Sequence, residues 1–171
     1  STIASAAAHL ELNIVLAAPT GKAAKRLEQV VGHEASTIHR LLGFNGHTYS
    51  RDAANPIEAD ILVVDEVSMV DVPLAWRLFQ AVDLTRTAVV LVGDHNQLPP
   101  VGPGNLLRDL VKSRTVPTTV LTQIIRQAGV LKANSTAILS GEVRPTCETK
   151  NGARRPWYVI DKFTDAGDVR S

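Results

Sequence analysis

Two adjacent carboxylates, Asp65 and Glu66, follow an apolar run at residues 61–64 and are well suited to chemistry. The run Ile-Leu-Val-Val is typical of a strand buried on both faces of a parallel sheet. In open α/β sheets, ligands bind at the carboxyl ends of the strands, where Asp65 is expected. A carboxylate there can hold Mg²⁺, directly or through water, and Glu66 can orient or deprotonate a water that attacks a phosphate. The alternative is that both residues cap the next helix.

Two further polar residues follow strand candidates. Residues 87–92 predict a buried strand that ends in a polar cluster containing Gln97. Gln97 can donate and accept hydrogen bonds, which suits a residue that touches both a phosphate and a water. Arg126 follows the strand candidate at residues 117–121 and is a candidate phosphate clamp, because its planar fork matches phosphate oxygens. An ordinary surface arginine is the alternative.

A set of residues after two earlier elements could bind an anion. A buried strand is expected at residues 12–18, and a helix begins after it. Thr20, Gly21 and Lys22 present a hydroxyl, backbone N–H groups and a cation at that helix start, which suits a nucleic-acid phosphate. An ordinary solvated helix start is the alternative. His39 lies on a short helix that is capped by Ser36 or Thr37 and ends at Gly43; it faces either a polar ligand or water.

The remaining pattern is that of an α/β chain. A polar, Gly- and Asn-rich excursion is expected at 45–56, and a mobile polar loop at 146–155. Trp76 and Phe79 are expected in the core, and Asp71 is expected to cap the helix that contains them. The expected helices are 1–12, from 22, 71–82, 105–111 and 130–140, and the remaining expected strand is 157–160.

Composition sets limits on the class of protein. The chain has 171 residues, of which 44% are hydrophobic, enough for one domain with a core. The formal net charge is +1, so any nucleic-acid binding must come from local patches. The single cysteine, Cys147, excludes an internal disulfide and fits a reducing, cytoplasmic location. No apolar run reaches transmembrane length and no signal peptide is seen, so no membrane partner is expected.

Several segments together resemble superfamily 1 helicases, most closely the RecD-like branch. Residues 17–27 resemble motif Ia, and residues 36–43 resemble the DNA-facing segment that follows it. Residues 63–69, 93–101 and 121–128 resemble motifs II (Walker B), III and IV, in the family's order. The resemblance covers about residues 12–130. It implies an α/β fold, the RecA-like P-loop NTPase three-layer sandwich with a parallel sheet.

The resemblance also implies roles, cofactors and partners. Asp65 would belong to an Mg²⁺ site, Glu66 would activate water, and Gln97 and Arg126 would contact the γ-phosphate of ATP. The residues implied along single-stranded DNA are Pro19, Thr20, Gly21, Lys22, His39 and Arg40. Four of them are expected to lie away from the carboxylates and to be reachable from them through Gln97: Thr20, Lys22, His39 and Arg40.

One departure from the family concerns the P-loop. Gly21-Lys22 does not match it, because Leu16 and Ala23 occupy positions that require Gly and Ser/Thr. Ser1-Thr2 could be the tail of such a motif. We therefore expect residues 1–145 to be a fragment of the first RecA-like motor domain, without its first strand and P-loop and inactive alone. Residues 146–171 would hold a loop, a strand and the start of another element.

The implied parent is an ATP-dependent DNA helicase with 5′-to-3′ polarity, acting in repair, recombination or conjugative transfer. Its expected partners are single-stranded DNA, a second motor domain of the same parent, and nuclease or recombination subunits. The alternative function is a non-catalytic nucleic-acid-binding or scaffold module that kept the RecA-like fold.

Overall fold

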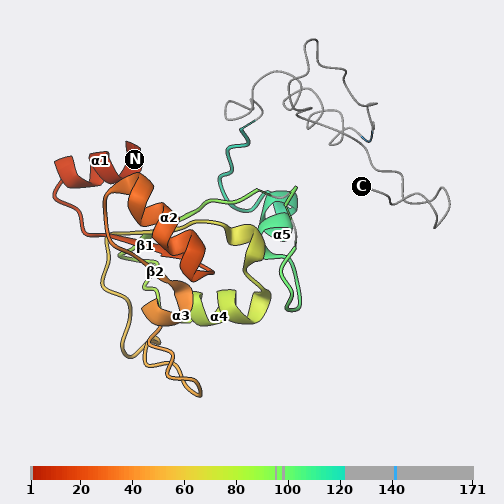
Figure 1. Cartoon of the computed structure of the whole chain (residues 1–171), viewed down its shortest axis with the longest axis horizontal. Coiled ribbons are helices and arrows are strands. Elements are labelled where there is room, and N and C mark those ends of the chain that lie inside the picture. Colours follow the sequence, from red (N-terminus) through yellow and green to blue (C-terminus); the bar gives the residue numbers. More distant parts are fainter. Residues whose placement is uncertain (1, 95, 98, 122–140, 142–171) are drawn as a thin grey trace, which may run out of the picture. The chain divides into compact units, whose positions relative to one another are not determined.

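Four parallel strands form the centre of the described part of the chain (Figure 1). They are β1 (Ile14–Ala18), β2 (Ala35–Thr37), β3 (Ile61–Val64) and β4 (Ala88–Leu91), in the spatial order β2-β1-β3-β4. All three ladders are parallel, with Ala17 opposite Val64 and Val64 opposite Leu91. The carboxyl ends of the strands therefore meet at one edge of the sheet, as an open α/β architecture requires.

The computed structural model describes residues 2–94, 96–97, 99–121 and 141. By its contacts the chain divides into two compact units, Ser1–Thr118 and Thr119–Ser171. The strands and helices of the described residues all lie in the first unit. The domain boundary predicted after residue 145 lies outside the described residues and stays a prediction. The helix predicted at 130–140 and the strand predicted at 157–160 also lie outside them.

Helices cover both faces of the sheet, which gives the three layers that the sequence predicts. Figure 1 shows α1 and α2 on one side of the sheet and α3 and α4 on the other. A 3-10 helix, η1, follows β3, and α5 follows the loop after β4. The bounds are α1 (Thr2–His9), α2 (Gly21–Val31), α3 (Ile38–Leu41), η1 (Val67–Met69), α4 (Val72–Gln80) and α5 (Leu106–Ser113).

The core follows the alternation of side chains along the strands. Leu62 and Val64 lie in one buried cluster with Ile38 of α3 and Leu78 of α4. Leu16 and Val63 are also buried, and they line a hollow with residues of α1 and α2 on the opposite face. The apolar runs of β1 and β3 thus supply both faces, which explains why they lack polar alternation.

Local chemistry sets the helix ends. The Asp71 carboxylate accepts a hydrogen bond from the Leu74 N–H at 2.8 Å and caps α4, as predicted. Of the two predicted caps of α3, Thr37 is the one used: its hydroxyl accepts from the Arg40 N–H at 3.2 Å. Gly43 follows that helix with φ 64°, a conformation that glycine adopts readily.

Several sequence predictions are wrong. Trp76 is 60% exposed, not in the core, because α4 buries Ala75 and Leu78 on another side. Residues 117–121 form no strand. β4 is only partly buried. β2 has no apolar run, and the sequence pattern does not predict it. None of the helices that the structure describes is long and apolar enough to cross a membrane.

Candidate functional site

The two carboxylates stand where β3 ends. The Asp65 N–H donates to the carbonyl oxygen of Ala17 at 2.9 Å, so Asp65 is tied to β1. One oxygen of the Asp65 carboxylate, Oδ1, accepts the Glu66 N–H at 2.9 Å. Glu66 has φ 55° and ψ 38°, a left-handed conformation that is uncommon for residues other than glycine. Glu11 and Arg114 have similar φ values, so the position at the end of a buried strand, and not the conformation alone, marks Glu66 as a candidate.

The alternative that these two carboxylates cap a helix finds no support in the hydrogen bonds. Glu66 stands at the N-cap position of η1 but makes no side-chain cap bond. The next helix, α4, is capped by Asp71. Asp65 and Glu66 are half-buried, so their carboxylates retain contact with the solvent from which a ligand would come.

Asp65 fits a magnesium site of the kind that substrate phosphates complete. Its second oxygen, Oδ2, accepts no hydrogen bond from the described residues. Mg²⁺ is usually held by one or two carboxylates together with phosphates and waters, not by a cage of protein ligands. In the described part of the chain, no group of three or more His, Cys, Asp or Glu side chains could hold a metal. Asp65 Oδ2 is therefore one carboxylate oxygen that such a site could use.

A hollow of about 290 Å³ lies beside Asp65. Its walls come from α1, α2, β1, β3 and Val92, and Asp65 is the one charged residue among the described residues that line it. The walls are otherwise apolar and carry no cation for a triphosphate. Residues of α1 therefore line the same hollow as the Asp65 carboxylate, but the hollow does not form a phosphate site by itself.

The ends of β3 and β4 are joined directly. The Val67 N–H donates to the carbonyl oxygen of Val92 at 2.9 Å. A Cβ added at Gly93 would lie 3.1 Å from the Ser68 nitrogen and 3.2 Å from the Val67 nitrogen, so glycine permits this close approach. The sequence-based prediction does not include this contact, although Gly93 directly after an apolar run is the signal for it.

Gln97 lies in the turn that follows β4. The Gln97 N–H donates to the Asp94 carbonyl oxygen at 3.1 Å, and the Asp94 carboxylate accepts the Asn96 N–H at 3.0 Å. The Gln97 amide nitrogen is 3.4 Å from the Asp94 carboxylate, and its side chain is exposed. Gln97 is therefore exposed in the turn after β4 and bonded there to Asp94. Arg126 lies outside the described residues.

The expected DNA residues gather after β1 and β2. Thr20 caps α2 by accepting the Ala23 N–H at 3.2 Å, while Gly21 and Lys22 are exposed. His39 and Arg40 are exposed on α3. Since Ala18 lies opposite Thr37 in the ladder, the two groups start from neighbouring strands. Pro19, at the turn itself, is half-buried.

The expected separation of these residues from the carboxylates is wrong. The strand order β2-β1-β3-β4 puts the DNA candidates after the first two strands and Asp65 after the third. Gln97 follows β4, on the far side of the carboxylates from β1. All the described candidates therefore share one edge, and Asp65, not Gln97, is the neighbour of the β1 segment.

These features define an α/β protein of the RecA-like fold: a parallel sheet with helices on both faces and paired carboxylates at the carboxyl edge. The chain belongs to the AAA domain family, which it matches over residues 1–155.

The comparison with known proteins also confirms the resemblance to RecD-like superfamily 1 helicases. The chain is 46% identical to an ATP-dependent RecD2 DNA helicase of Deinococcus radiodurans, over 98% of this chain and 25% of that protein. It is 38% identical to the RecBCD enzyme subunit RecD of Haemophilus influenzae, over 63% of this chain and 20% of that protein. The chain thus spans about a quarter or less of the length of these two relatives. A structure of Bacteroides Pif1 bound to ssDNA is 22% identical, with a TM-score of 0.49, over 83% of this chain and 40% of that one.

Proposed function

We propose that this chain is part of an ATP-dependent DNA helicase motor that couples ATP hydrolysis to translocation along single-stranded DNA, with 5′-to-3′ unwinding. The observation that carries the proposal is the Asp65 N–H bond to Ala17, which joins the carboxylate pair to the strand leading into Pro19 and Thr20. The residues proposed for hydrolysis and those proposed to bind phosphate thus follow adjacent strands, β3 and β1. Two relatives, an ATP-dependent DNA helicase and a RecBCD subunit, support it.

Each carboxylate has a separate proposed task. The half-buried Asp65 would hold Mg²⁺, which when bound neutralises charge on the phosphate oxygens of ATP. Glu66, with its backbone held in one conformation, would orient the attacking water and accept its proton. Gln97 would contact the γ-phosphate and the water, and Arg126 would clamp the γ-phosphate during transfer.

The DNA path would follow the β1 and β2 ends of the edge. Lys22 and Arg40 would contact phosphates, since both cations are exposed there. Pro19, Thr20, Gly21 and His39 would line the same path. The proximity of this path to Asp65 gives a short physical route between hydrolysis and strand movement.

In the whole protein, residues 1–145 would form the first RecA-like motor domain, and residues 146–171 would lead out of it. The further partners would be a second motor domain of the same protein and nuclease or recombination subunits. We propose that the protein acts in the cytoplasm, where Cys147 would stay reduced.

A non-catalytic nucleic-acid-binding or scaffold module is the second candidate. The observation that favours it is the hollow beside Asp65, because its described lining is otherwise apolar and offers no cation for a triphosphate. Such a module would bind DNA but would not turn over ATP.

The test uses the full-length protein that carries this chain, with Glu66→Gln and, as a matched control, Glu11→Gln at an exposed position. ATP binding and DNA-stimulated hydrolysis are measured separately. We expect Glu66→Gln to bind ATP and to lose about 100-fold or more in kcat, because the amide cannot take a proton. Normal hydrolysis by Glu66→Gln would show that the roles are wrong. DNA binding without any ATP turnover by the unsubstituted protein would favour the scaffold module.

A further inference from the structure

Among the residues that the structure describes, two polar side chains are deeply buried: Ser68 and Thr87, each 5% exposed. The Thr87 hydroxyl donates to the Ala59 carbonyl oxygen at 2.6 Å. The Ser68 hydroxyl has no hydrogen-bond partner in the same part of the chain. A buried hydroxyl that has left water without gaining a partner raises the free energy of the arrangement that contains it. Ser68 therefore calls for a reason beyond packing.

The segment that carries Ser68 is bonded to both ends of the loop after β4. Two backbone hydrogen bonds do this: from the Val67 N–H to the Val92 carbonyl oxygen at 2.9 Å, and from the Val72 N–H to the Pro103 carbonyl oxygen at 3.1 Å. The loop between these anchors, residues 93–102, contains Gln97. The loop that carries the proposed phosphate contact is thus the neighbour of Ser68.

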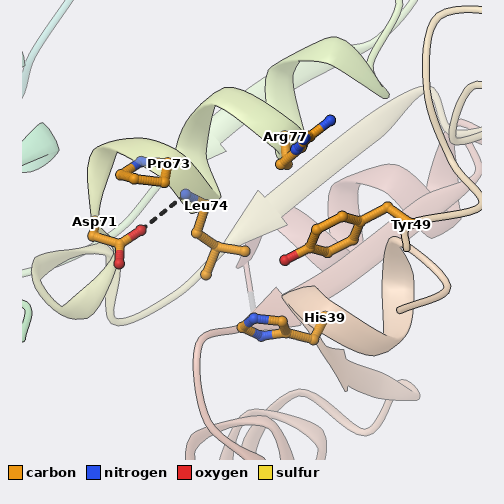
Figure 2. A pocket seen from close by; sticks show the side chains of 6 residues that line it. All are labelled: His39, Tyr49, Asp71, Pro73, Leu74 and Arg77. Carbon is orange, nitrogen blue, oxygen red and sulfur yellow. Dashed lines mark hydrogen bonds between the residues drawn. The ribbon is translucent and has the colours of Figure 1, made fainter. Parts of the chain in front are cut away.

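The far end of this loop packs on the cap of α4. Figure 2 shows the cap, in which the Asp71 carboxylate accepts the Leu74 N–H. A Cβ added at Gly102 would meet the Asp71 side chain, so glycine permits the loop to lie there. A capped helix therefore fixes this end of the loop.

Ser68 is not placed to touch a ligand in either hollow of the described part of the chain. The second hollow, of about 280 Å³, lies beside the α4 cap, and His39, Tyr49 and Arg77 are among the residues that line it (Figure 2). The described lining of this hollow does not include Ser68, and neither does that of the hollow beside Asp65. This placement favours an action through another residue.

The near end of the loop meets Ser68 directly. A Cβ added at Gly93 would lie 3.1 Å from the Ser68 nitrogen, and Asp94 is the next residue. Asp94 accepts the Gln97 N–H with its carbonyl oxygen at 3.1 Å and the Asn96 N–H with Oδ1 at 3.0 Å. The Gln97 amide nitrogen lies 3.4 Å from Asp94 Oδ2, which is longer than the usual range for such a bond. Oδ2 is therefore the most weakly held of these three acceptors.

We propose that Ser68 is a positioning residue for ATP hydrolysis, whose hydroxyl donates to Asp94 Oδ2 when the Gln97 side chain turns to the γ-phosphate. In the present structure Gln97 is the donor to that oxygen. The exchange of donors keeps the Asp94 carboxylate bonded in both arrangements and gives Ser68 a partner only in the second. The inference rests on the proposed function, and on the proposed role of Gln97 in particular.

The unpaired hydroxyl biases the balance between the two arrangements. Its cost falls on the arrangement in which Gln97 is bonded to Asp94, so it favours the one in which Gln97 faces the phosphate. A bond that forms only as Gln97 engages the γ-phosphate acts on the hydrolytic step more than on ATP binding. The effect should therefore appear in kcat and not in KM.

The test uses the full-length protein with Ser68→Ala. The matched control is Thr87→Val, which removes the hydroxyl of the equally buried residue whose partner is in place. Each protein is measured for thermal unfolding and for DNA-stimulated ATP hydrolysis, with kcat and KM separated. Ser68→Ala is also combined with Gln97→Ala, and the slow remaining hydrolysis is followed in single turnovers with the protein in excess.

We expect Ser68→Ala to unfold at the same or a higher temperature and to lose about tenfold in kcat, the effect of one hydrogen bond, with KM for ATP unchanged. Thr87→Val should show the reverse, a lower unfolding temperature with kcat and KM unchanged. In the Gln97→Ala background, Ser68→Ala should cause no further loss, because the residue through which it acts is gone.

Two results would overturn the inference. A Ser68→Ala protein that unfolds at a lower temperature and keeps its kcat would show a purely structural hydroxyl. Losses that multiply in the double variant would show that Ser68 does not act through Gln97. An unsubstituted protein that does not hydrolyse ATP would instead overturn the proposed function, and the inference with it.

Discussion

The Val67 N–H lies 2.9 Å from the carbonyl oxygen of Val92, and this hydrogen bond joins the segment after β3 to the segment after β4. Glu66 directly precedes Val67, and the turn that contains Gln97 follows Val92. The proposed water-activating and phosphate-contacting residues are therefore linked through the backbone, which changes geometry less easily than side chains do.

Gly93→Ala tests this link. A methyl group at Gly93 would lie 2.9 Å from Leu107 Cδ2 and 3.1 and 3.2 Å from the backbone nitrogens of Ser68 and Val67, so it should displace Leu107 and push the two strand ends apart. We expect a lower kcat for ATP hydrolysis in the full-length protein and a loss of about 1–3 kcal/mol in the free energy of unfolding. Gly46→Ala places a methyl group in open space at φ 98°, so it is a glycine substitution without a steric contact. Equal kcat values for the two variants would contradict the link.

Glu66→Gly should separate stability from activity. Glu66 has φ 55°, and a left-handed conformation costs an L-residue about 1 kcal/mol or somewhat more. Glycine removes that cost, so thermal unfolding should occur at a higher temperature while ATP hydrolysis is lost. Glu11 has φ 54° at an exposed position, and Glu11→Gly should raise stability without reducing hydrolysis. A destabilised Glu66→Gly protein would show that its side chain contributes more than its strained backbone costs.

Lys22→Ala and Arg40→Ala should each weaken single-strand binding to a similar degree for all sequences. Contacts to phosphates carry no sequence information, and each one lost should reduce the slope of log K against log salt by about 0.7 for a single strand. The measurement is a binding titration at several salt concentrations. Lys112→Ala, an exposed lysine on α5, is the control. Unchanged slopes would indicate that these two cations are ordinary solvated residues.

The Asp83 carboxylate should titrate at a lower pH than usual. The Thr85 hydroxyl donates to it at 2.7 Å and the Thr85 N–H at 3.0 Å, and these bonds lower the pKa of Asp83. A lowered pKa in the folded state means that the stabilisation is present above the unfolded-state pKa. It is lost as pH falls through the folded-state pKa. Thr85→Val should move the pKa of Asp83 back towards its ordinary value, as measured by NMR titration.

The sequence predicts most of the described elements because their signals are local. The apolar runs of β1 and β3, and the Asp71 cap of α4, each depend on a few consecutive residues. β2 has no such signal, since Ala-Ser-Thr is neither apolar nor alternating, and it forms because it pairs with β1. The sequence misplaces Trp76 because α4 carries apolar residues on more than one side, and only packing decides which side is buried.

Some residues of the candidate site can likewise be predicted from local sequence, and others cannot. Asp65 and Glu66 can be found from one strand and its end, and Gln97 from another. The meeting of His39 and Tyr49 with Arg77 depends on the fold, because these residues are far apart in the chain. The sequence signal for Tyr49 is that it is an aromatic residue within the polar segment at 45–56. That signal does not show which residues Tyr49 contacts.

The exposure of Trp76 makes it an optical reporter within the protein. Its indole is 60% exposed on α4 and precedes Arg77, which lines the second hollow. Indole emission shifts to shorter wavelength when water is displaced from the ring. Because Trp157 emits as well, a Trp157→Phe variant of this chain leaves Trp76 as its reporter, and the emission then registers when DNA or another protein surface covers that side of α4.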